Sequence, residues 1–189
     1  MIKTKDDYYQ YIEHDKNALG ISRHRPRIFA DEIWKFQRIM RKYEYINNCK
    51  KGILWIPIKK IMQFKYKKIS MRLGFSIPIN TFGPGLAILH RGTIVVNGNA
   101  KIGANCRINI DVNIGTQMGY KDACPTIGNN VFIGPGAKLF NKITVGDNVA
   151  IGANSVVNKN IPDNVSIAGI PAKIINNRGT QGVFAYYLD

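Results

Sequence analysis

An aliphatic residue recurs at every sixth position through most of the second half of the chain. The series crosses one interruption and consists of Val96, Ile102, Ile108, Ile114, Ile127, Ile133, Leu139, Val145, Ile151 and Val157. Gly or Asn follows nearly every member, and both types tolerate the left-handed backbone of tight corners. A small or apolar residue comes four positions after each member. Short strands separated by two-residue corners, three to a coil of about 18 residues, give this spacing in a parallel β-helix.

The alternative architecture is a β-sandwich, whose strands alternate apolar and polar residues with a period of two and whose turns are irregularly spaced. The constant step of six favours the β-helix. The interruption at residues 119–126, with the sequence GYKDACPT, is expected to form an external loop at one corner of the coil. Insertions of this kind often serve binding.

Helical spacing dominates the region before the repeat. Residues 4–18 and 30–47 are expected to be helices, the second with apolar residues at steps of three or four and with Asp31 as its N-cap. Residues 53–72 form a third candidate helix with Pro57 in its first turn. Its apolar positions are Ile58, Ile61, Met62 and Ile69, and lysines stand opposite them.

Residue usage changes near Gly74 and Pro78, from a region rich in Lys, Arg, Tyr and Trp to one rich in Gly, Asn, Ile and Val. We therefore predict a mainly β protein in three parts. A basic helical segment covers residues 1–74, the β-helix covers residues 75–175, and a tail covers residues 176–189.

The 189 residues carry a net charge of +15, of which residues 1–74 contribute +11. The usual interpretation of such a charge is a solvated helical face. Two others stay open: steering of anionic substrates, and contact of residues 53–72 with an anionic membrane surface. The basic residues form no known nucleic-acid-binding motif, which disfavours a nucleic-acid partner.

Cysteine usage and the apolar segments bear on the compartment. Three cysteines without motif spacing argue against a disulfide-stapled secreted protein. The first residues lack the apolar core of a signal peptide, and no stretch reaches 18 uncharged apolar residues. The sequence therefore predicts a cytoplasmic protein, with peripheral contact at the inner face of the membrane as an option.

Four segments resemble the hexapeptide-repeat acyltransferases, and within them the serine acetyltransferase branch, to which capsule and exopolysaccharide acetyltransferases also belong. They are GPGLAILHRGTIVVN at 83–97, CPTIGNNVFIGPGAKLF at 124–140, VAIGANSVV at 149–157 and IPDNVSIAGIPAKII at 161–175. The resemblance implies a left-handed coil with acetyl-CoA as donor, and with one histidine in the repeat no metal is expected. It also implies a homotrimer, or a dimer of trimers, with active sites in the grooves between neighbouring subunits.

The catalytic histidine of that family falls on His90. The resemblance implies that it is the general base, taking a proton from an acceptor hydroxyl as the oxygen attacks the thioester; imidazole, with an unperturbed pKa near 6.5, suits this role. His14 and His24 lie in the basic segment and are expected at the surface. His90 lies one step of six before Val96, where the repeat predicts an aliphatic residue, and this exception favours a functional role over a structural one.

By the same resemblance, the pantetheine arm of CoA lies along the coil edge and bonds mainly to the backbone. The matching positions are small residues at corners, in which Pro135 replaces the usual Ala, and two lysines near the C-terminal end are candidates for the CoA phosphates. The cofactor-binding set is Gly115, Thr116, Gly134, Pro135, Gly152, Ala153, Lys159 and Lys173. Corner geometry alone would also explain the glycines.

The acceptor is predicted from departures from the family. Leu89 stands where an Asp precedes the catalytic histidine, Phe75 stands where an Asp orients it, and Ala123 and Cys124 replace an Arg-His pair. Without these groups the charges of free serine would be left unpaired, which favours a sugar hydroxyl in capsular or exopolysaccharide synthesis. Serine in cysteine biosynthesis is the alternative, and the ending Tyr186–Asp189 differs from the isoleucine with which such enzymes dock on a partner sulfhydrylase. The candidate acceptor-binding residues are Asn97, Asn109, Asp111, Asn113, Tyr120 and Cys124, and Asp111 is also a candidate for orienting His90.

Two further classes of function were weighed. A β-helix that binds zinc between subunits, as in γ-class carbonic anhydrases, needs three His ligands, and the repeat contains one. A purely structural or binding scaffold would leave His90 replaceable and would not bind acetyl-CoA.

Overall fold

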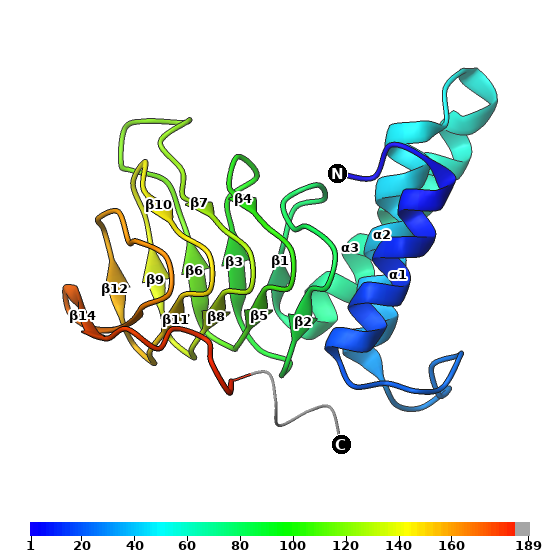
Figure 1. Cartoon of the computed structure of the whole chain (residues 1–189). Helices are drawn as coiled ribbons and strands as arrows, with labels where there is room; N and C mark the ends of the chain where they lie inside the picture. The colour runs from blue at the N-terminus through cyan, green and yellow to red at the C-terminus, as the bar shows by residue number, and fades with distance from the viewer. Residues whose placement is uncertain (184–189) are drawn as a thin grey trace.

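The computed structural model describes residues 1–183, in which three helices lead into a coil of short parallel strands (Figure 1). The helices are α1 (Lys5–Ala18), α2 (Glu32–Cys49) and α3 (Ile56–Leu73), and a 3-10 turn, η1 (Ile53–Trp55), precedes α3. None of the helices within the described part of the chain has the length and hydropathy to span a bilayer. The change from helix to strand falls between Leu73 and Phe75, where residue usage changes. Residues 176–183 of the predicted tail are described, and its last residues, including Tyr186–Asp189, lie outside the described range.

The strands wind into a left-handed β-helix of about five turns, as the sequence predicted. Three sheets form its faces, with the strand orders β1-β3-β6-β9-β12, β10-β7-β4 and β14-β13-β11-β8-β5-β2. All pairings are parallel except the last, between β13 and β14. The bounds are β1 (Phe75–Ser76), β2 (Ala87–Ile88), β3 (Ile94–Val96), β4 (Lys101–Ile102), β5 (Arg107–Ile108), β6 (Val112–Ile114), β7 (Thr126–Ile127), β8 (Phe132–Ile133), β9 (Lys138–Leu139), β10 (Thr144–Val145), β11 (Ala150–Ile151), β12 (Val156–Val157), β13 (Ser166–Gly169) and β14 (Ala172–Asn176).

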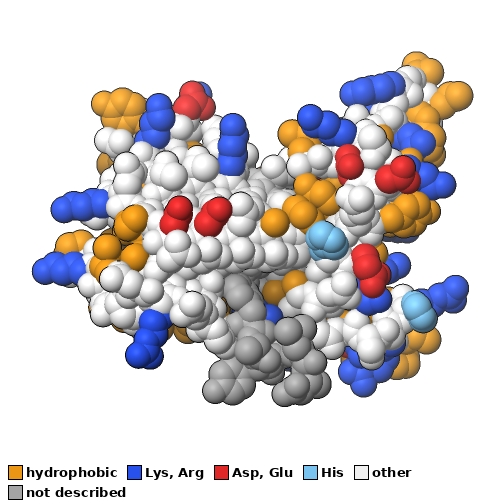
Figure 2. All heavy atoms as spheres, viewed as in Figure 1, with side chains coloured by type: hydrophobic (Ala, Val, Ile, Leu, Met, Phe, Trp, Pro, Cys, Tyr) orange, Lys and Arg blue, Asp and Glu red, His pale blue; other side chains and the backbone are white. Residues whose placement is uncertain are grey.

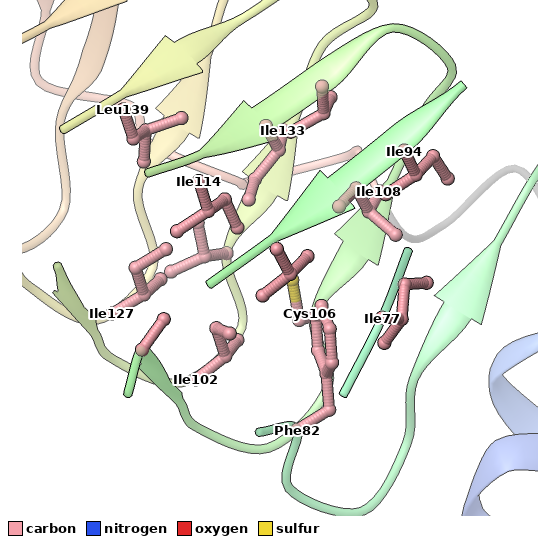
Figure 3. Packing of buried hydrophobic residues seen from close by; sticks show 14 of the residues in the cluster. Ile77, Phe82, Ile94, Ile102, Cys106, Ile108, Ile114, Ile127, Ile133 and Leu139 are labelled. Atoms are coloured by element: carbon pink, nitrogen blue, oxygen red, sulfur yellow. The ribbon is translucent and has the colours of Figure 1, made fainter. Parts of the chain in front are cut away.

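The aliphatic series is the core of this coil. All ten predicted positions are buried, and each stacks on its counterpart one coil away, as Ile108 does on Ile133 and Ile114 on Leu139 (Figure 3). The positions four residues later are buried as well, except Met118, which directly precedes the external loop. The same aliphatic contacts repeat from coil to coil and are closely packed. For this reason only Ile, Leu and Val occur at the ten positions of the series.

The glycines after the aliphatic residues have a different role from the predicted one. They do not have a positive φ; the left-handed residues come two positions later, at Asn105, Asn130 and Asn148 among others. A Cβ added at Gly134 would lie 2.8 Å from the backbone nitrogen of Ala153 in the next coil. These glycines are therefore required by the close approach of successive coils, while Asn takes the left-handed corner.

The helices agree with the predicted ranges but differ in two details. Asp31 precedes α2 with a φ of 59° and does not cap it; its carboxylate accepts the backbone N–H of Arg27 instead. On α3 the buried face consists of Met62, Tyr66, Ile69 and Leu73, whereas Ile58 and Ile61 are exposed. The apolar side predicted for this helix was thus correct only for Met62 and Ile69.

A buried ionic cluster joins the helical segment to the first coil. The guanidinium of Arg41, fully buried on α2, contacts Asp15 of α1 at 2.8 Å and Glu44 at 3.0 Å, and donates to the carbonyl of Gly83 at 2.6 Å. Asp15 also accepts the backbone N–H groups of Gly85 and Leu86, both at 2.9 Å. Burial alone would lower the pKa of Arg41, but the two carboxylates outweigh it and raise it. The helices are therefore fixed against the strand that leads to His90.

Candidate functional site

His90 lies in a corner of the coil that is longer than its counterparts. Ile88 pairs with Ile108 and Ile94 pairs with Val112, so five residues separate the strands where the next coil has three. The register position that the repeat assigned to His90 is in fact filled by Ile88. His90 therefore does not interrupt the core. It is exposed in a corner that is two residues longer than its counterpart, and we call residues 89–93 the His90 corner.

The backbone of the His90 corner is tied on both sides. Leu89 donates its N–H to the carbonyl of Ile108 at 3.2 Å, and Gly92 donates to the carbonyl of Leu73, the last residue of α3, at 3.0 Å. Gly92 has a φ of 146°, and a Cβ there would lie 3.1 Å from the side chain of Ile110. The corner is thus fixed by the coil below it and by the end of the helical segment, while the imidazole is left accessible.

A pocket of about 310 Å³ opens beside the imidazole. The His90 corner contributes Leu89, His90 and Arg91, and the start of α2 contributes Asp31, Glu32 and Ile33. Sequence reasoning missed the contribution of α2, because the contact joins residues almost 60 positions apart. Arg91 could have been identified from the sequence, because it directly follows the candidate base His90.

The pocket contains charges of both signs. Glu32 contacts Arg72 of α3 at 2.8 Å and Arg91 at 3.4 Å, so one carboxylate is shared between two guanidinium groups. Asp31 accepts the backbone N–H of Arg27 at 2.8 Å and contacts the side chain of Arg23 at 2.5 Å. The N–H of Arg27 and the neighbouring arginines lower the pKa of Asp31 to about 2. The carboxylate of Asp31 is therefore ionised at neutral pH, and the contacts with the arginines preform this side of the pocket.

Residues predicted to bind CoA fall on two different corners of the coil. Gly134 and Pro135 follow β8, and Gly152 and Ala153 follow β11, in the column of corners that begins with His90. The others belong elsewhere: Gly115 and Thr116 follow β6, Lys159 follows β12, and Lys173 is exposed on β14. A single chain therefore brings only the first four into line with His90.

The glycine N–H groups in this set already have partners. Those of Gly134 and Gly152 donate to the carbonyls of Ile151 and Ile167, both at 2.8 Å, and that of Gly115 donates to Leu139 at 2.8 Å. They hold successive coils together and are not available to a ligand. What these corners offer CoA is a smooth edge of small residues such as Ala153, which is exposed.

Several candidates for the acceptor site have structural contacts instead. Cys124 is buried in the core, and the buried amide of Asn109 donates to the carbonyl of Ile133 at 3.2 Å. Neither is available to an acceptor, which corrects both assignments. Asp111 is paired with Lys138 at 3.0 Å on the next coil, and the structure shows no contact between it and His90. Within residues 1–183 the imidazole of His90 has no hydrogen-bond partner, so none of these residues fixes its orientation.

The remaining acceptor candidates lie away from the pocket. Asn97 follows β3 and accepts the N–H of Asn99 at 2.9 Å, while Asn113 is exposed on β6. Tyr120 is exposed in the external loop, whose base is held by the Thr116 hydroxyl bonded to the carbonyls of Tyr120 and Ala123. Among the described residues no group of three or more His, Cys, Asp or Glu side chains has a geometry suited to a metal ion.

A family model and several known proteins that match this chain are transferases. Residues 124–159 match the family model "Bacterial transferase hexapeptide (six repeats)". The chain is 37% identical over 102 residues to a serine acetyltransferase of Synechococcus elongatus, a match that covers 52% of this chain and 41% of that protein. A serine acetyltransferase of Buchnera aphidicola is 35% identical over 136 residues, covering 70% of this chain and 50% of that protein. The chain thus spans about half the length of these curated relatives.

Solved structures extend the likeness through the helical segment. A serine acetyltransferase of Brucella abortus in complex with coenzyme A superposes with a TM-score of 0.74 at 26% identity. The superposition covers 93% of this chain and 70% of that one. Together with the repeat and the left-handed coil, these matches show that the chain belongs to the hexapeptide-repeat acyltransferase family.

Proposed function

We propose that the protein is an acetyl-CoA-dependent O-acetyltransferase in which His90 is the general base and L-serine is the acceptor. The observation that carries this proposal is the exposed imidazole of His90 at the edge of a charged pocket. The relatives that match this chain are named serine acetyltransferases. The match to a structure containing coenzyme A supports the donor.

For this reaction the protein has to position the two substrates and to transfer one proton. The Nδ1 or Nε2 atom of His90 takes the proton of the acceptor hydroxyl while its oxygen forms a bond to the carbonyl carbon of the thioester. The carbon–sulfur bond then breaks, and the sulfur of CoA takes the proton from the His90 imidazolium and leaves as the free thiol. A positioned general base of this kind contributes roughly 10² to 10⁴ in rate.

The charged lining is what favours a zwitterionic acceptor. The sequence argument for a sugar was that the ammonium and carboxylate of serine would be left without partners. The structure places Glu32 and Arg91, which carry opposite charges, in one pocket with His90. An ammonium group beside Glu32 and a carboxylate beside Arg91 would both be paired, at the expense of the 3.4 Å contact between the two residues.

A sugar hydroxyl is the second candidate acceptor. It is favoured by Leu89, Ala123 and Cys124, which replace charged residues of the serine acetyltransferases that the sequence resembles. The comparisons support the serine assignment better, since the similar proteins and structures carry that name. The polysaccharide assignment therefore takes second place.

The test is acetyl-CoA turnover, read as released thiol, with L-serine and with a panel of neutral sugars and oligosaccharides. We expect turnover with serine and a rise of about tenfold or more in the KM for serine in Arg91→Gln, with kcat largely kept, because a charge-assisted hydrogen bond contributes about 1.5–3 kcal/mol. The matched control is Arg178→Gln, an exposed arginine outside the pocket. Turnover with sugars alone would replace serine by the second candidate.

The homotrimer belongs to the proposal as well. A mass in solution of about three times the 21.2 kDa of one chain is expected, and a multiple of that trimer is compatible with the proposal. A monomer that turns over acetyl-CoA at full rate would contradict the assignment of the site to a groove between subunits.

A further inference from the structure

The far end of the helical segment exposes large apolar side chains. In η1 and at the outer side of α3, Ile53, Leu54, Phe64 and Met71 are 78%, 83%, 67% and 77% exposed, and Ile61 is also exposed. In Figure 1 the junction of α2 and α3 projects beyond the β-helix, and in Figure 2 hydrophobic and basic side chains gather there. Isolated exposed aliphatic residues are ordinary, but a contiguous set on one element indicates an interaction surface.

Helix α3 has two apolar faces of different kinds. Met62, Tyr66, Ile69 and Leu73 are buried and pack toward α2 and the first coil. The opposite side exposes Pro57, Ile61, Phe64 and Met71, which recur at intervals of three or four residues except for one position, which Lys68 occupies. Since the first face already holds the helix in the fold, the second face is not needed for folding. We call the exposed residues of η1 and this second face the outer face.

The segment that carries the outer face contains charges of one sign. Between Tyr45 and Ile110 the sequence contains no Asp or Glu. Residues 50–72 contain eight cations, among which Lys60, Lys65, Lys67 and Lys68 are exposed beside the apolar side chains. Exposed aliphatic and aromatic residues flanked by lysines on a helix are the pattern of helices that lie in the interface of an anionic bilayer.

Charge complementarity also decides between the possible occupants. A second copy of the same face would oppose its lysines to lysines, and like charges directly opposite cost several kcal/mol in an interface. An anionic lipid surface instead attracts each cation and accepts the apolar side chains without a shaped groove. We propose that the outer face docks on a bilayer of anionic phospholipid and holds the protein at a membrane surface as a peripheral protein.

The outer face runs along α3, so its two ends lie at different distances from the candidate active site. Ile53 and Leu54 of η1 follow the last residue of α2, whereas the pocket beside His90 is lined by the first residues of α2. At the other end of α3, Met71 precedes Arg72, which contacts Glu32 of the pocket lining at 2.8 Å. The proposal rests on the outer face alone and stands independently of the proposed acceptor.

The test is flotation of the full chain with vesicles of phosphatidylglycerol and phosphatidylcholine, with pure phosphatidylcholine vesicles as the neutral control. We expect binding to the anionic vesicles only, and weaker binding at 0.5 M salt. Each cation near an anionic surface contributes about fivefold in binding, so Lys60→Gln/Lys68→Gln should weaken binding by about 25-fold. Phe64→Ser should weaken it by about tenfold or more through lost apolar burial.

Matched variants separate docking from general charge and hydrophobicity. Lys101→Gln/Lys142→Gln removes two exposed lysines of the β-helix, and Met118→Ser removes a side chain that is 94% exposed just before the external loop. Both should bind vesicles like the unmodified chain. Equal weakening in these controls, or no binding to anionic vesicles, would overturn the proposal. A change of mass in solution in Phe64→Ser, without vesicle binding by the unmodified chain, would assign the face to self-association instead.

Discussion

In the β-helix each coil repeats the contacts of the one before, whereas the helical segment is joined to the first coil by contacts that occur once. The repeated contacts are aliphatic stacks such as Ile108 on Ile133 on Ile151. The single contacts include the cluster of Arg41, Asp15 and Glu44 and the 2.5 Å hydrogen bond from Gln37 to the carbonyl of Leu86. The candidate active site lies where the two regions meet.

This difference explains how the two regions tolerate change. An aliphatic stack loses one layer when a residue is truncated, and the coils above and below keep their own contacts. The ionic cluster has no second copy, and loss of one member leaves a buried charge without its partner. The largest single effect on stability is therefore expected in the helical segment, although most of the core lies in the β-helix.

Asp15→Ala should have the largest effect. It leaves the guanidinium of Arg41, fully buried, without its closest carboxylate, and the N–H groups of Gly85 and Leu86 lose their acceptor. We expect a loss of about 3–5 kcal/mol in the free energy of unfolding, measured by urea denaturation. Glu13→Ala, which removes an acidic residue from the surface of the same helix, is the matched control and should change little. Equal stability of the two variants would contradict the role given to the cluster.

Ile133→Ala probes the repeated contacts. Ile133 is fully buried and stacked on both sides, so its truncation should lower the free energy of unfolding by about 2–5 kcal/mol. Ile61→Ala makes the same chemical change on the outer face of α3, where the side chain is 55% exposed, and should stay within about 0.5 kcal/mol. A similar loss in both variants would show that Ile61 is covered in the protein in solution.

Gly134→Ala tests the close approach of coils. The added methyl would lie 2.8 Å from the backbone nitrogen of Ala153, and overpacking of this kind costs about 1–3 kcal/mol. At Gly98 a Cβ meets nothing nearer than Pro78 at 3.7 Å, so Gly98→Ala should be close to neutral. Thermal unfolding of the two variants gives the comparison. A neutral Gly134→Ala would mean that successive coils separate more easily than their packing indicates.

The β-helix could be predicted from sequence because each six-residue step of the sequence corresponds to one strand and one corner of the coil. One six-residue register, read from Val96 to Val157, fixed the strands, the core and the position of the external loop. The same register failed at its first step backward, since two extra residues precede Ile94 and move His90 from the core position to a corner. The step of six resumes before the insertion at Ile88 and Phe82, which stack on Ile108 and Ile102, but two members are too short a series to reveal the shift from sequence alone.

The candidate site could be predicted only in part for a related reason. His90 was found because a histidine is rare in this repeat and because the sequence around it resembles a family motif. Asp31 and Glu32 line the same pocket, but they reach it through the packing of α2 on the first coil, which no local pattern encodes. Cys124 and Asn109 were assigned to the acceptor although they serve the core and a corner, because polar residue type alone does not reveal direction.

The most direct test of the account replaces the imidazole and leaves the fold intact. Acetyl-CoA turnover with L-serine should be measured for His90→Asn beside His24→Asn, an exposed histidine outside the pocket. We expect a loss of roughly 10² to 10⁴ in kcat for His90→Asn, with unchanged thermal unfolding, and full activity for His24→Asn. Turnover that survives in His90→Asn at the rate of the unmodified chain would contradict the assignment of His90 as the general base.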